Sequence, residues 1–220
     1  MVTLHHLQNS RSQRILWMLE ELNVPYDIAL YKRDTKTDLA PASLKKVHPL
    51  GKSPVITDGD ITVAESGAIV EYLGQTYGEG FQPPRGTAES REYSYWMHFS
   101  EGSLMQQLLI QLIFDKVKAA PLPFFIKPIA KGIAKKVMDG YVGPNIKASV
   151  EYIDKHLSIN EWFCGDQMTG ADIQMSFPLE GLVAKQDMAA YPNIVNYVKK
   201  FQARPAYQKA LEAGGEYHYA

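Results

Sequence analysis

The chain has 220 residues, of which 45% are hydrophobic and 21% are charged, and its formal net charge at pH 7 is −1. This composition is too apolar for a disordered protein, and the near-zero charge excludes the global basic field that draws proteins to nucleic acid. Nucleic acid is therefore not an expected partner. The length suits one large domain or two small ones.

A single cysteine, Cys164, excludes an internal disulfide and a cysteine-only zinc site, and it suits a reducing compartment such as the cytoplasm. We expect it to be a buried thiol rather than a reactive one. The chain opens with a strand pattern rather than a signal peptide, and no apolar run approaches the roughly 18 residues of a membrane span. The six histidines show no metal-ligand spacing, so no metal site is expected.

Strand and helix patterns alternate in the first part of the chain. Residues 2–7 alternate as a short strand, apolar residues recur at helical spacing from Ser12 onward, and residues 24–32 alternate again. A strand–helix–strand run this short predicts a right-handed crossover and a parallel pair of strands. A lysine-rich loop follows, with a short helix predicted over residues 41–47.

Residues 53–57 and 61–65 are β-rich runs on either side of an Asp-Gly-Asp turn, which predicts a hairpin. A helical pattern then begins at Ser66. The order β-α-β, loop, β-β-α makes a small mixed α/β sheet, and we expect a domain over residues 1–79.

Residues 80–87 lie in a stretch of glycines and prolines that we interpret as a linker. The patterns after it are helical, which predicts an all-α domain over residues 88–220. The expected helices cover residues 89–114, 145–157, 169–185, 194–204 and 206–214.

Thr169 and Asp172 have the spacing of a capping box at the start of one of these helices, with Met168 and Ile173 placed as its hydrophobic staple. We expect this box to be structural rather than catalytic, and its loss to weaken folding by about 1 kcal/mol or more.

The turn after the first strand is unusually polar. Ser10, Arg11, Ser12 and Arg14 crowd the start of the first helix. Strand-to-helix turns often hold anions, because free backbone N–H groups and the helix dipole point at the ligand. These residues could form an anion site or act only as polar caps.

Four motifs and this layout resemble the cytosolic glutathione S-transferases. The motifs are "SRSQR" at the first helix, "HPLGKSPVI" before the hairpin, "AESGAIVEYL" at the next helix and "TGADI" in the second half. They follow in the family's order and spacing and cover nearly the whole chain. The resemblance implies a thioredoxin-like N-terminal domain, an all-helical C-terminal domain, and glutathione as co-substrate without a metal.

The chemistry of that family explains the polar turn. A free thiol has a pKa of about 8.5, and only the thiolate attacks electrophiles well. A neutral hydroxyl is too weak a base, but it can donate a hydrogen bond to the sulfur. The resemblance implies that Ser10 is this donor, with Asn9 and Ser12 as competitors, although Ser12 is also a natural N-cap. Some classes use a tyrosine near the end of the first strand, where this chain has His5 and His6.

The resemblance assigns further glutathione contacts to Lys52, Ser53, Val55, Glu65 and Ser66. It implies a cis bond between Ser53 and Pro54, which would turn the backbone of Val55 outward to pair with the cysteinyl part. Lys52 would reach the backbone or the glycyl carboxylate, and Glu65 and Ser66 would hold the γ-glutamyl end at a helix N-terminus. The structural alternatives are an ordinary trans proline on an edge strand and a serine N-cap.

Several classes hold the glycyl end with a histidine in the preceding loop. This chain offers basic residues there instead, and any of them could serve: Lys32, Arg33, Lys36, Lys45 and Lys46.

The second substrate should lie between the domains. The candidates for its pocket are Tyr95, His98, Met105, Tyr217 and Tyr219, although apolar stripes of this kind are more often core.

Residues 121–143 combine phenylalanines and isoleucines with lysines, prolines and glycines. We expect an excursion that caps the active-site cleft, because helix breakers interrupt the segment. Contact with an anionic membrane is the alternative.

The predicted function is a glutathione transferase that conjugates small hydrophobic electrophiles, with reduction of organic hydroperoxides as a further use. The alternative is a non-catalytic or regulatory glutathione-binding protein of the same fold. The related isomerases have a cysteine directly after the serine, where this chain has Arg11, so that function is disfavoured. The resemblance also implies a homodimer.

Overall fold

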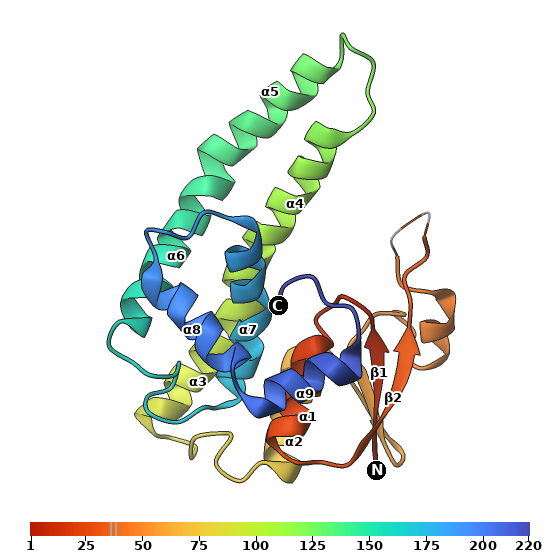
Figure 1. The fold of residues 1–220 in the computed structure, drawn as a ribbon, viewed down its shortest axis with the longest axis vertical. Coiled ribbons are helices and arrows are strands. Elements are labelled where there is room, and N and C mark those ends of the chain that lie inside the picture. Colours follow the sequence, from red (N-terminus) through yellow and green to blue (C-terminus); the bar gives the residue numbers. More distant parts are fainter. Residues whose placement is uncertain (36, 38) are drawn as a thin grey trace.

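A computed structural model describes residues 1–35, 37 and 39–220. Its N-terminal part is a four-stranded mixed sheet in the order β2-β1-β3-β4, with β1 and β2 parallel and the other pairs antiparallel (Figure 1). The predicted parallel pair and the predicted hairpin are therefore confirmed. The strands are β1 (Val2–Leu7), β2 (Tyr26–Tyr31), β3 (Val55–Asp58) and β4 (Ile61–Ala64).

Two α-helices of this part, α1 (Gln13–Glu21) and α2 (Ser66–Tyr77), contact each other and the later helix α7. The short helix expected near residue 41 is the 3₁₀ helix η1 (Ala42–Lys46). Residues 78–87 contain neither helix nor strand. The division of the chain into domains at residues 79 and 88 stays a prediction.

The C-terminal part is helical. Its helices are α3 (Ala88–Phe99), η2 (Ser100–Met105), α4 (Gln106–Ala119), α5 (Lys127–Val137), η3 (Met138–Val142), α6 (Gly143–Leu157), α7 (Gly170–Lys185), α8 (Pro192–Gln202) and α9 (Pro205–Gly214). With the sheet part, this is the predicted α/β plus all-α architecture.

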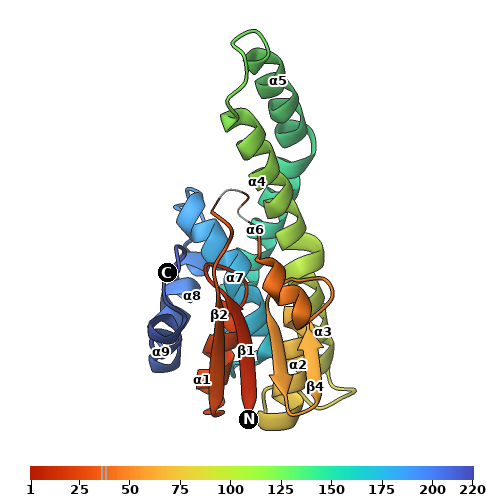
Figure 2. The ribbon, with the colours of Figure 1, turned by 90° about the vertical axis from the view of Figure 1, so that its right-hand side faces the viewer.

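Two continuous helical runs differ from the expected boundaries. The π-helical segment η2 joins α3 to α4, so the expected helix over residues 89–114 in fact spans residues 88–119. Similarly, η3 joins α5 to α6, giving one run over residues 127–157. In Figures 1 and 2, α4 and α5 form a hairpin that projects away from the sheet.

Aromatic packing joins the sheet part to the last helices. Trp17 of α1 is fully buried, stacks on Phe201 of α8 at 5.1 Å between ring centroids, and meets Tyr207 of α9 edge-on at 5.6 Å. Burial of large aromatic side chains contributes much of the stability of a core. The two parts therefore share one hydrophobic core.

The capping box at α7 is present as expected. Thr169 is the N-cap, and its backbone N–H donates to the Asp172 carboxylate at 2.7 Å. Asp172 also accepts from the Phe163 backbone N–H at 2.9 Å and from the Tyr197 hydroxyl at 2.6 Å. The box thus fixes the start of α7 and ties it to the preceding loop and to α8.

Candidate functional site

A cavity of about 560 Å³ lies where the turn after β1 meets the helical part. Its polar side comes from the sheet part and includes Asn9, Ser10, Arg33, Lys52 and Ser53. A cavity that is charged on one side and open enough for a small molecule suits a polar ligand with carboxylate groups.

The opposite side of the cavity comes from the helical part and the C-terminal tail (residues 215–220) and includes an apolar stretch. This stretch consists of Met105, Leu108, Leu109 and Leu112 from the long helical run, Phe177 and Pro178 from α7, and Tyr219 from the tail, and the polar residues of this side are Gln111, Asp115, Lys185 and Gln186. An apolar molecule would therefore fit beside the polar ligand.

The two serines of the first turn have different surroundings. Ser10 is 6% exposed and lines the cavity, and its hydroxyl donates to the Leu7 carbonyl at 2.7 Å. Ser12 is fully buried, does not line the cavity, and lies 2.9 Å from the Ser10 hydroxyl. Of these two hydroxyls, only that of Ser10 can turn toward a ligand in the cavity.

Ser12 is held by a buried histidine. Its hydroxyl lies 2.7 Å from Nδ1 of His6, and Nε2 of His6 lies 3.1 Å from the carbonyl of Gly214. Because that carbonyl can only accept, Nε2 carries the hydrogen and Nδ1 accepts from Ser12. Burial lowers the pKa of His6 to about 4, so the ring is neutral at pH 7. Ser12 occupies the N-cap position of α1, but its side chain makes no capping bond.

Asn9, the other competitor, is engaged with the C-terminal tail. Asn9 has a positive φ of 53°. Its Nδ2 lies 2.9 Å from Nδ1 of His218, and its Oδ1 accepts from the His218 backbone N–H at 3.3 Å. The backbone of Asn9 thus directs its side chain toward the tail, while Ser10 stays free to face the cavity.

Arg14 is buried beside the cavity and joins the two parts of the chain. Its guanidinium donates to the Ser66 hydroxyl, the Gln174 carbonyl and the Glu101 carboxylate, each at 2.5 Å. Arg11 donates to the same carboxylate at 3.2 Å. Burial opposes the ionisation of Glu101, but the two arginines outweigh it and hold the pKa of that carboxyl below its usual value.

Ser53 lines the cavity and is tied to β1. The Ser53–Pro54 bond is cis, as expected. The Ser53 hydroxyl accepts from the Leu7 backbone N–H at 3.1 Å and donates to the His5 carbonyl at 2.9 Å. Val55 is 1% exposed, does not line the cavity, and pairs with β1 and β4. The contact of its backbone with glutathione stays a prediction.

Glu65 and Ser66 open α2 but do not line the cavity. Glu65, not Ser66, is the N-cap, and its φ of 71° is a conformation that side-chain-bearing residues rarely adopt. The Ser66 hydroxyl accepts from Arg14 instead of capping the helix.

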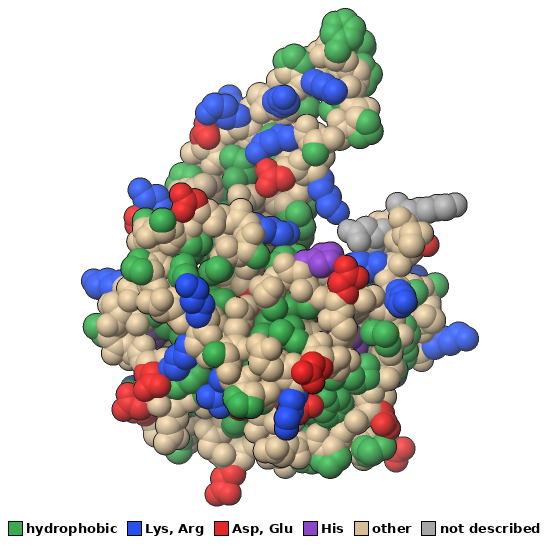
Figure 3. All heavy atoms as spheres, in the orientation of Figure 1, with side chains coloured by type: hydrophobic (Ala, Val, Ile, Leu, Met, Phe, Trp, Pro, Cys, Tyr) green, Lys and Arg blue, Asp and Glu red, His purple; other side chains and the backbone are tan. Residues whose placement is uncertain are grey.

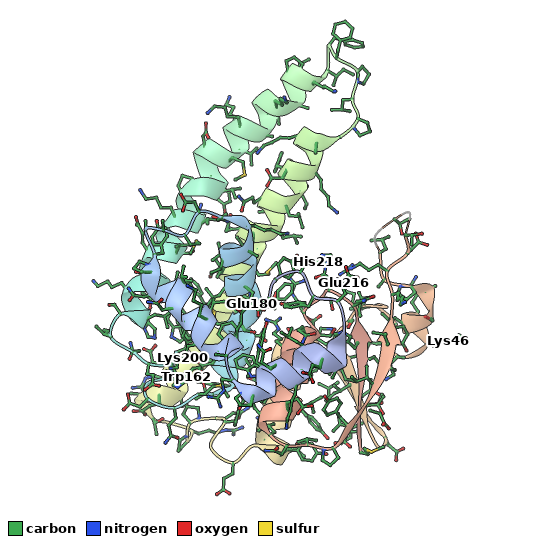
Figure 4. The ribbon with its side chains drawn as sticks, in the orientation of Figure 1. Lys46, Trp162, Glu180, Lys200, Glu216 and His218 are labelled. Atoms are coloured by element: carbon green, nitrogen blue, oxygen red, sulfur yellow. The ribbon has the colours of Figure 1, made fainter. Side chains whose placement is uncertain are left out.

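Some of the basic residues considered for the glycyl carboxylate line the cavity, and others do not. Arg33 lines the cavity, and so does Lys52. Lys36 lies outside the described residues. Lys32, Lys45 and Lys46 do not line the cavity, and Figure 4 shows Lys46 at the outer side of the molecule.

Of the residues considered for the second substrate, Met105 and Tyr219 line the cavity, whereas Tyr95, His98 and Tyr217 do not. Residues 121–143 differ from their expected role. None of them lines the cavity, because they belong to the far end of the α4–α5 hairpin and to the helix leading back from it. The expectation that they cap the cleft is therefore wrong.

Comparisons with known proteins match both parts of the chain to one family. The glutathione S-transferase N-terminal domain matches residues 1–75, and the glutathione S-transferase C-terminal domain matches residues 122–213. Glutathione S-transferase 3 of Schizosaccharomyces pombe is 41% identical over 216 residues, covering 96% of this chain and 87% of that protein. This chain belongs to the glutathione S-transferase family.

Further relatives of this glutathione S-transferase agree. Glutathione S-transferase 1 of Saccharomyces cerevisiae is 34% identical and covers 96% of this chain and 94% of its own. The crystal structure of a glutathione S-transferase from Actinobacillus pleuropneumoniae has a TM-score of 0.79 and 36% identity, covering 96% of this chain and 92% of that one. A sphingomonad glutathione S-transferase complexed with glutathione shares the fold, with a TM-score of 0.73 and 24% identity over 97% of this chain and 98% of that one.

Two other features of this glutathione S-transferase bear on its chemistry. Cys164 is half-buried, and burial raises the pKa of its thiol to about 12, which makes it a poor nucleophile. Among residues 1–35, 37 and 39–220, no three metal-ligating side chains come together. Over the same residues, no helix has the length and hydropathy needed to span a bilayer.

The sequence did not reveal how Glu101 pairs with Arg11 and Arg14, nor that Lys185 lines the cavity. Glu101 lies 87 residues from Arg14, so no local spacing links them. The sequence carries one signal for this ion pair: Arg14 lies beside the apolar positions of α1, and a buried cation there would need an anionic partner.

Glu180 of α7 holds the C-terminal tail of this transferase. Its carboxylate is 2% exposed and accepts from the hydroxyls of Tyr207 and Tyr217. Figure 4 shows Glu180 close to the segment that carries Glu216 and His218. Burial raises the pKa of Glu180 to about 7, although its hydrogen bonds oppose the rise.

We expect Glu180 to make the stability of the fold depend on pH. A carboxyl with a raised pKa holds its proton more tightly in the folded chain than in the unfolded chain. Its contribution to the free energy of unfolding therefore falls as the pH rises from 4.5 to about 7. Glu180→Gln should remove this fall, measured as urea midpoints at a series of pH values.

The lowered pKa of His6 gives a slope of the opposite sign, with stability rising from about pH 4 to pH 6.5. His6 is present in the wild type and in Glu180→Gln, so its effect cancels when their urea midpoints are compared. If the midpoints of the wild type and Glu180→Gln differed by the same amount at every pH, the role given to Glu180 would be wrong.

Proposed function

We propose that this transferase binds reduced glutathione on the polar side of the cavity and stabilises its thiolate with the Ser10 hydroxyl. The observation that carries the proposal is the position of Ser10. Of the two serines in the first turn, it is the one that lines the cavity. Its hydrogen now bonds the Leu7 carbonyl and would turn to the sulfur when glutathione binds.

Positive charge beside Ser10 supports the same role. Arg11 lines the cavity, and its guanidinium is shared with the carboxylate of Glu101. A fixed cation near the sulfur favours the thiolate over the thiol. Each unit by which the thiol pKa falls corresponds to about 1.36 kcal/mol of preference for the anion.

The rest of glutathione would be held by groups near this turn and at the start of α2. Arg33 and Lys52 supply cations for the glycyl carboxylate, and Ser53 lines the cavity beside the cis bond. The γ-glutamyl carboxylate is assigned to the N-terminus of α2 at Glu65 and Ser66, because Glu65 is exposed and the first N–H groups of a helix bind anions.

The second substrate is a small hydrophobic electrophile. The apolar stretch of the cavity, which includes Met105, Leu108 and Phe177, supports this choice. The thiolate sulfur attacks the electrophilic carbon, and the leaving group departs with its electron pair. The same thiolate would reduce an organic hydroperoxide by attacking its terminal oxygen, which breaks the O–O bond, releases the alkoxide to be protonated to the alcohol and leaves glutathione as a sulfenic acid. A second glutathione would then condense with the sulfenic acid to give the disulfide and water. We infer a homodimer and a cytoplasmic location from the family alone.

Calorimetry with reduced glutathione, followed by conjugation of an aryl halide and reduction of a hydroperoxide, tests the proposal. We expect saturable binding at millimolar glutathione and turnover with at least one of the two substrates. No uptake of glutathione would overturn the proposal. Binding without turnover across a broad panel of electrophiles would favour a non-catalytic glutathione-binding protein.

A further inference from the structure

α4 and α5 form what we call the distal hairpin, residues 106–137, with residues 120–126 as its tip. Figures 1 and 2 show from two sides that the tip is the part of the hairpin farthest from the sheet. The cavity is lined by residues at the base of α4 up to Asp115, and by none of residues 116–143. The function of the cavity therefore does not account for the outer half of the hairpin.

Large apolar side chains are exposed at the tip and along α5. Phe124 is 84% exposed and Phe125 is 63% exposed, and their rings pack edge to face against each other at 5.5 Å. Ile129 and Ile133, one turn apart on α5, are 62% and 56% exposed. Exposed apolar groups gathered in this way mark an interaction site rather than ordinary surface.

The same segment carries a strong positive charge. From residue 116 to residue 138 there are no acidic residues and six lysines: Lys116, Lys118, Lys127, Lys131, Lys135 and Lys136. With the flanking Asp115 and Asp139 counted, four positive charges remain in excess, although the whole chain has a net charge of −1. Figure 3 shows basic side chains in blue and hydrophobic side chains in green on the projecting element.

The pairing of these lysines leaves several available. Lys118 pairs with Asp115 at 2.8 Å, and Lys135 pairs with Asp139. In the part of the chain that the structure describes, no ion pair engages Lys127, Lys131 or Lys136. The cations nearest to the tip on α5 are thus free to meet an anionic partner.

An exposed apolar tip beside a row of lysines matches an anionic lipid surface. Phenylalanine and isoleucine side chains insert at the level of the acyl chains, while lysine stems lie along the apolar surface and hold their ammonium groups among the headgroups. Each lysine near an anionic leaflet adds to the attraction. Pairing with the hairpin of a second copy is disfavoured, because it would bring two excesses of positive charge together.

We propose that the distal hairpin binds the surface of an anionic membrane, with Phe124 and Phe125 entering the bilayer and the α5 lysines contacting its headgroups. The hairpin lies on the surface and does not span the bilayer. Its base would then hold the cavity close to a phase in which apolar electrophiles concentrate.

Sedimentation of the full chain with vesicles tests this proposal. The vesicles are pure phosphatidylcholine or phosphatidylcholine with about 30% phosphatidylserine, at about 0.1 M and about 0.5 M salt. We expect at least tenfold tighter binding to the anionic vesicles at low salt, and loss of most of that binding at high salt.

Two variants separate the apolar part from the charged part. Phe124→Ser/Phe125→Ser should weaken binding at least tenfold at either salt, because it removes the inserted rings. Lys127→Gln/Lys131→Gln/Lys136→Gln should weaken binding at low salt and flatten the salt dependence. Since these side chains are exposed, both variants should keep the wild-type melting temperature and conjugation rate without lipid.

Matched controls carry the same substitutions elsewhere on the surface. Ile159→Ser removes an apolar side chain that is 82% exposed, and Lys155→Gln/Lys199→Gln/Lys209→Gln removes three exposed lysines. Both should bind vesicles like the wild type. Vesicle binding that is absent, or equally affected by controls and hairpin variants, would overturn the proposal.

Sedimentation velocity without lipid tests the competing possibility that a second copy of the chain covers the distal hairpin. If Phe124→Ser/Phe125→Ser converts a dimer into a monomer and the wild type ignores vesicles, the distal hairpin is an interface between copies and the membrane proposal is wrong. An unchanged assembly state together with the vesicle results above supports the proposal.

Discussion

Ser10→Ala is expected to lower kcat/KM for conjugation by about 100-fold while glutathione still binds. The substitution removes the hydroxyl that lines the cavity at the first turn, and with it a hydrogen bond to the sulfur. A 100-fold loss corresponds to about 2.7 kcal/mol, or about two units of thiol pKa. The ultraviolet absorbance of bound thiolate across a pH series should show the thiol pKa rising by that amount.

Folding should change little in this variant. The Leu7 carbonyl loses its hydrogen bond from Ser10, and the Ser12 hydroxyl 3.1 Å away can replace it only by giving up its hydrogen bond to His6. We expect a loss of at most about 1 kcal/mol in the free energy of unfolding.

Ser12→Ala and Asn9→Ala are the matched controls. Ser12 bonds His6 inside the fold, so its loss should affect stability more than conjugation. The Asn9 side chain bonds His218 of the tail, so its loss should act through the tail rather than through the sulfur. Near-normal conjugation by Ser10→Ala, with a severe defect in either control, would assign the thiolate to the wrong residue.

Asp172→Ala is expected to lower the free energy of unfolding by about 3–5 kcal/mol. The carboxylate is fully buried and accepts from two backbone N–H groups and from the hydroxyls of Thr169 and Tyr197. Alanine leaves these donors buried without an acceptor. The effect should therefore exceed the loss of a single N-cap, and urea denaturation at constant slope measures it.

Thr169→Ala provides the comparison. It removes the capping hydroxyl and leaves the carboxylate in place, so a loss of about 1 kcal/mol is expected. Asp172→Asn keeps the size of the side chain but turns an amide N–H₂ toward existing donors, and its effect should lie between the two. If Asp172→Ala destabilised the fold no more than Thr169→Ala does, the carboxylate would be only a helix cap.

The sequence predicted what depends on neighbours along the chain. Apolar spacing located α1 and α2, the Asp-Gly-Asp turn located the β3–β4 hairpin, and the Thr169–Asp172 spacing located the capping box. The resemblance added the cis bond at Pro54 and brought attention to the turn of Ser10. Periodicity and turn chemistry are local properties, so a single sequence carries them.

Features that depend on distant contacts could not be predicted in this way. The pairing of Val55 with β1 and β4 is set by the sheet order, which the local sequence does not carry. Residues 121–143 were placed over the cleft because their composition does not say in which direction a hairpin projects. The N-cap alternative for Ser66 also depends on a distant contact, because its hydroxyl accepts a hydrogen bond from Arg14, 52 residues earlier, which no local spacing indicates.

The contact between α1 and α9 has a consequence for synthesis on the ribosome. The Gln13 side chain of α1 donates to the Ala210 carbonyl of α9 at 2.8 Å. Gly214 lies so close to the same side chain that a Cβ at position 214 would clash with it. The outer face of α1 is therefore covered only after almost the whole chain has been synthesised. A nascent chain that stops short of α9 leaves Trp17 without its contact to Tyr207 and more exposed to water, so premature termination should yield a target for chaperones and proteases rather than a working half-enzyme.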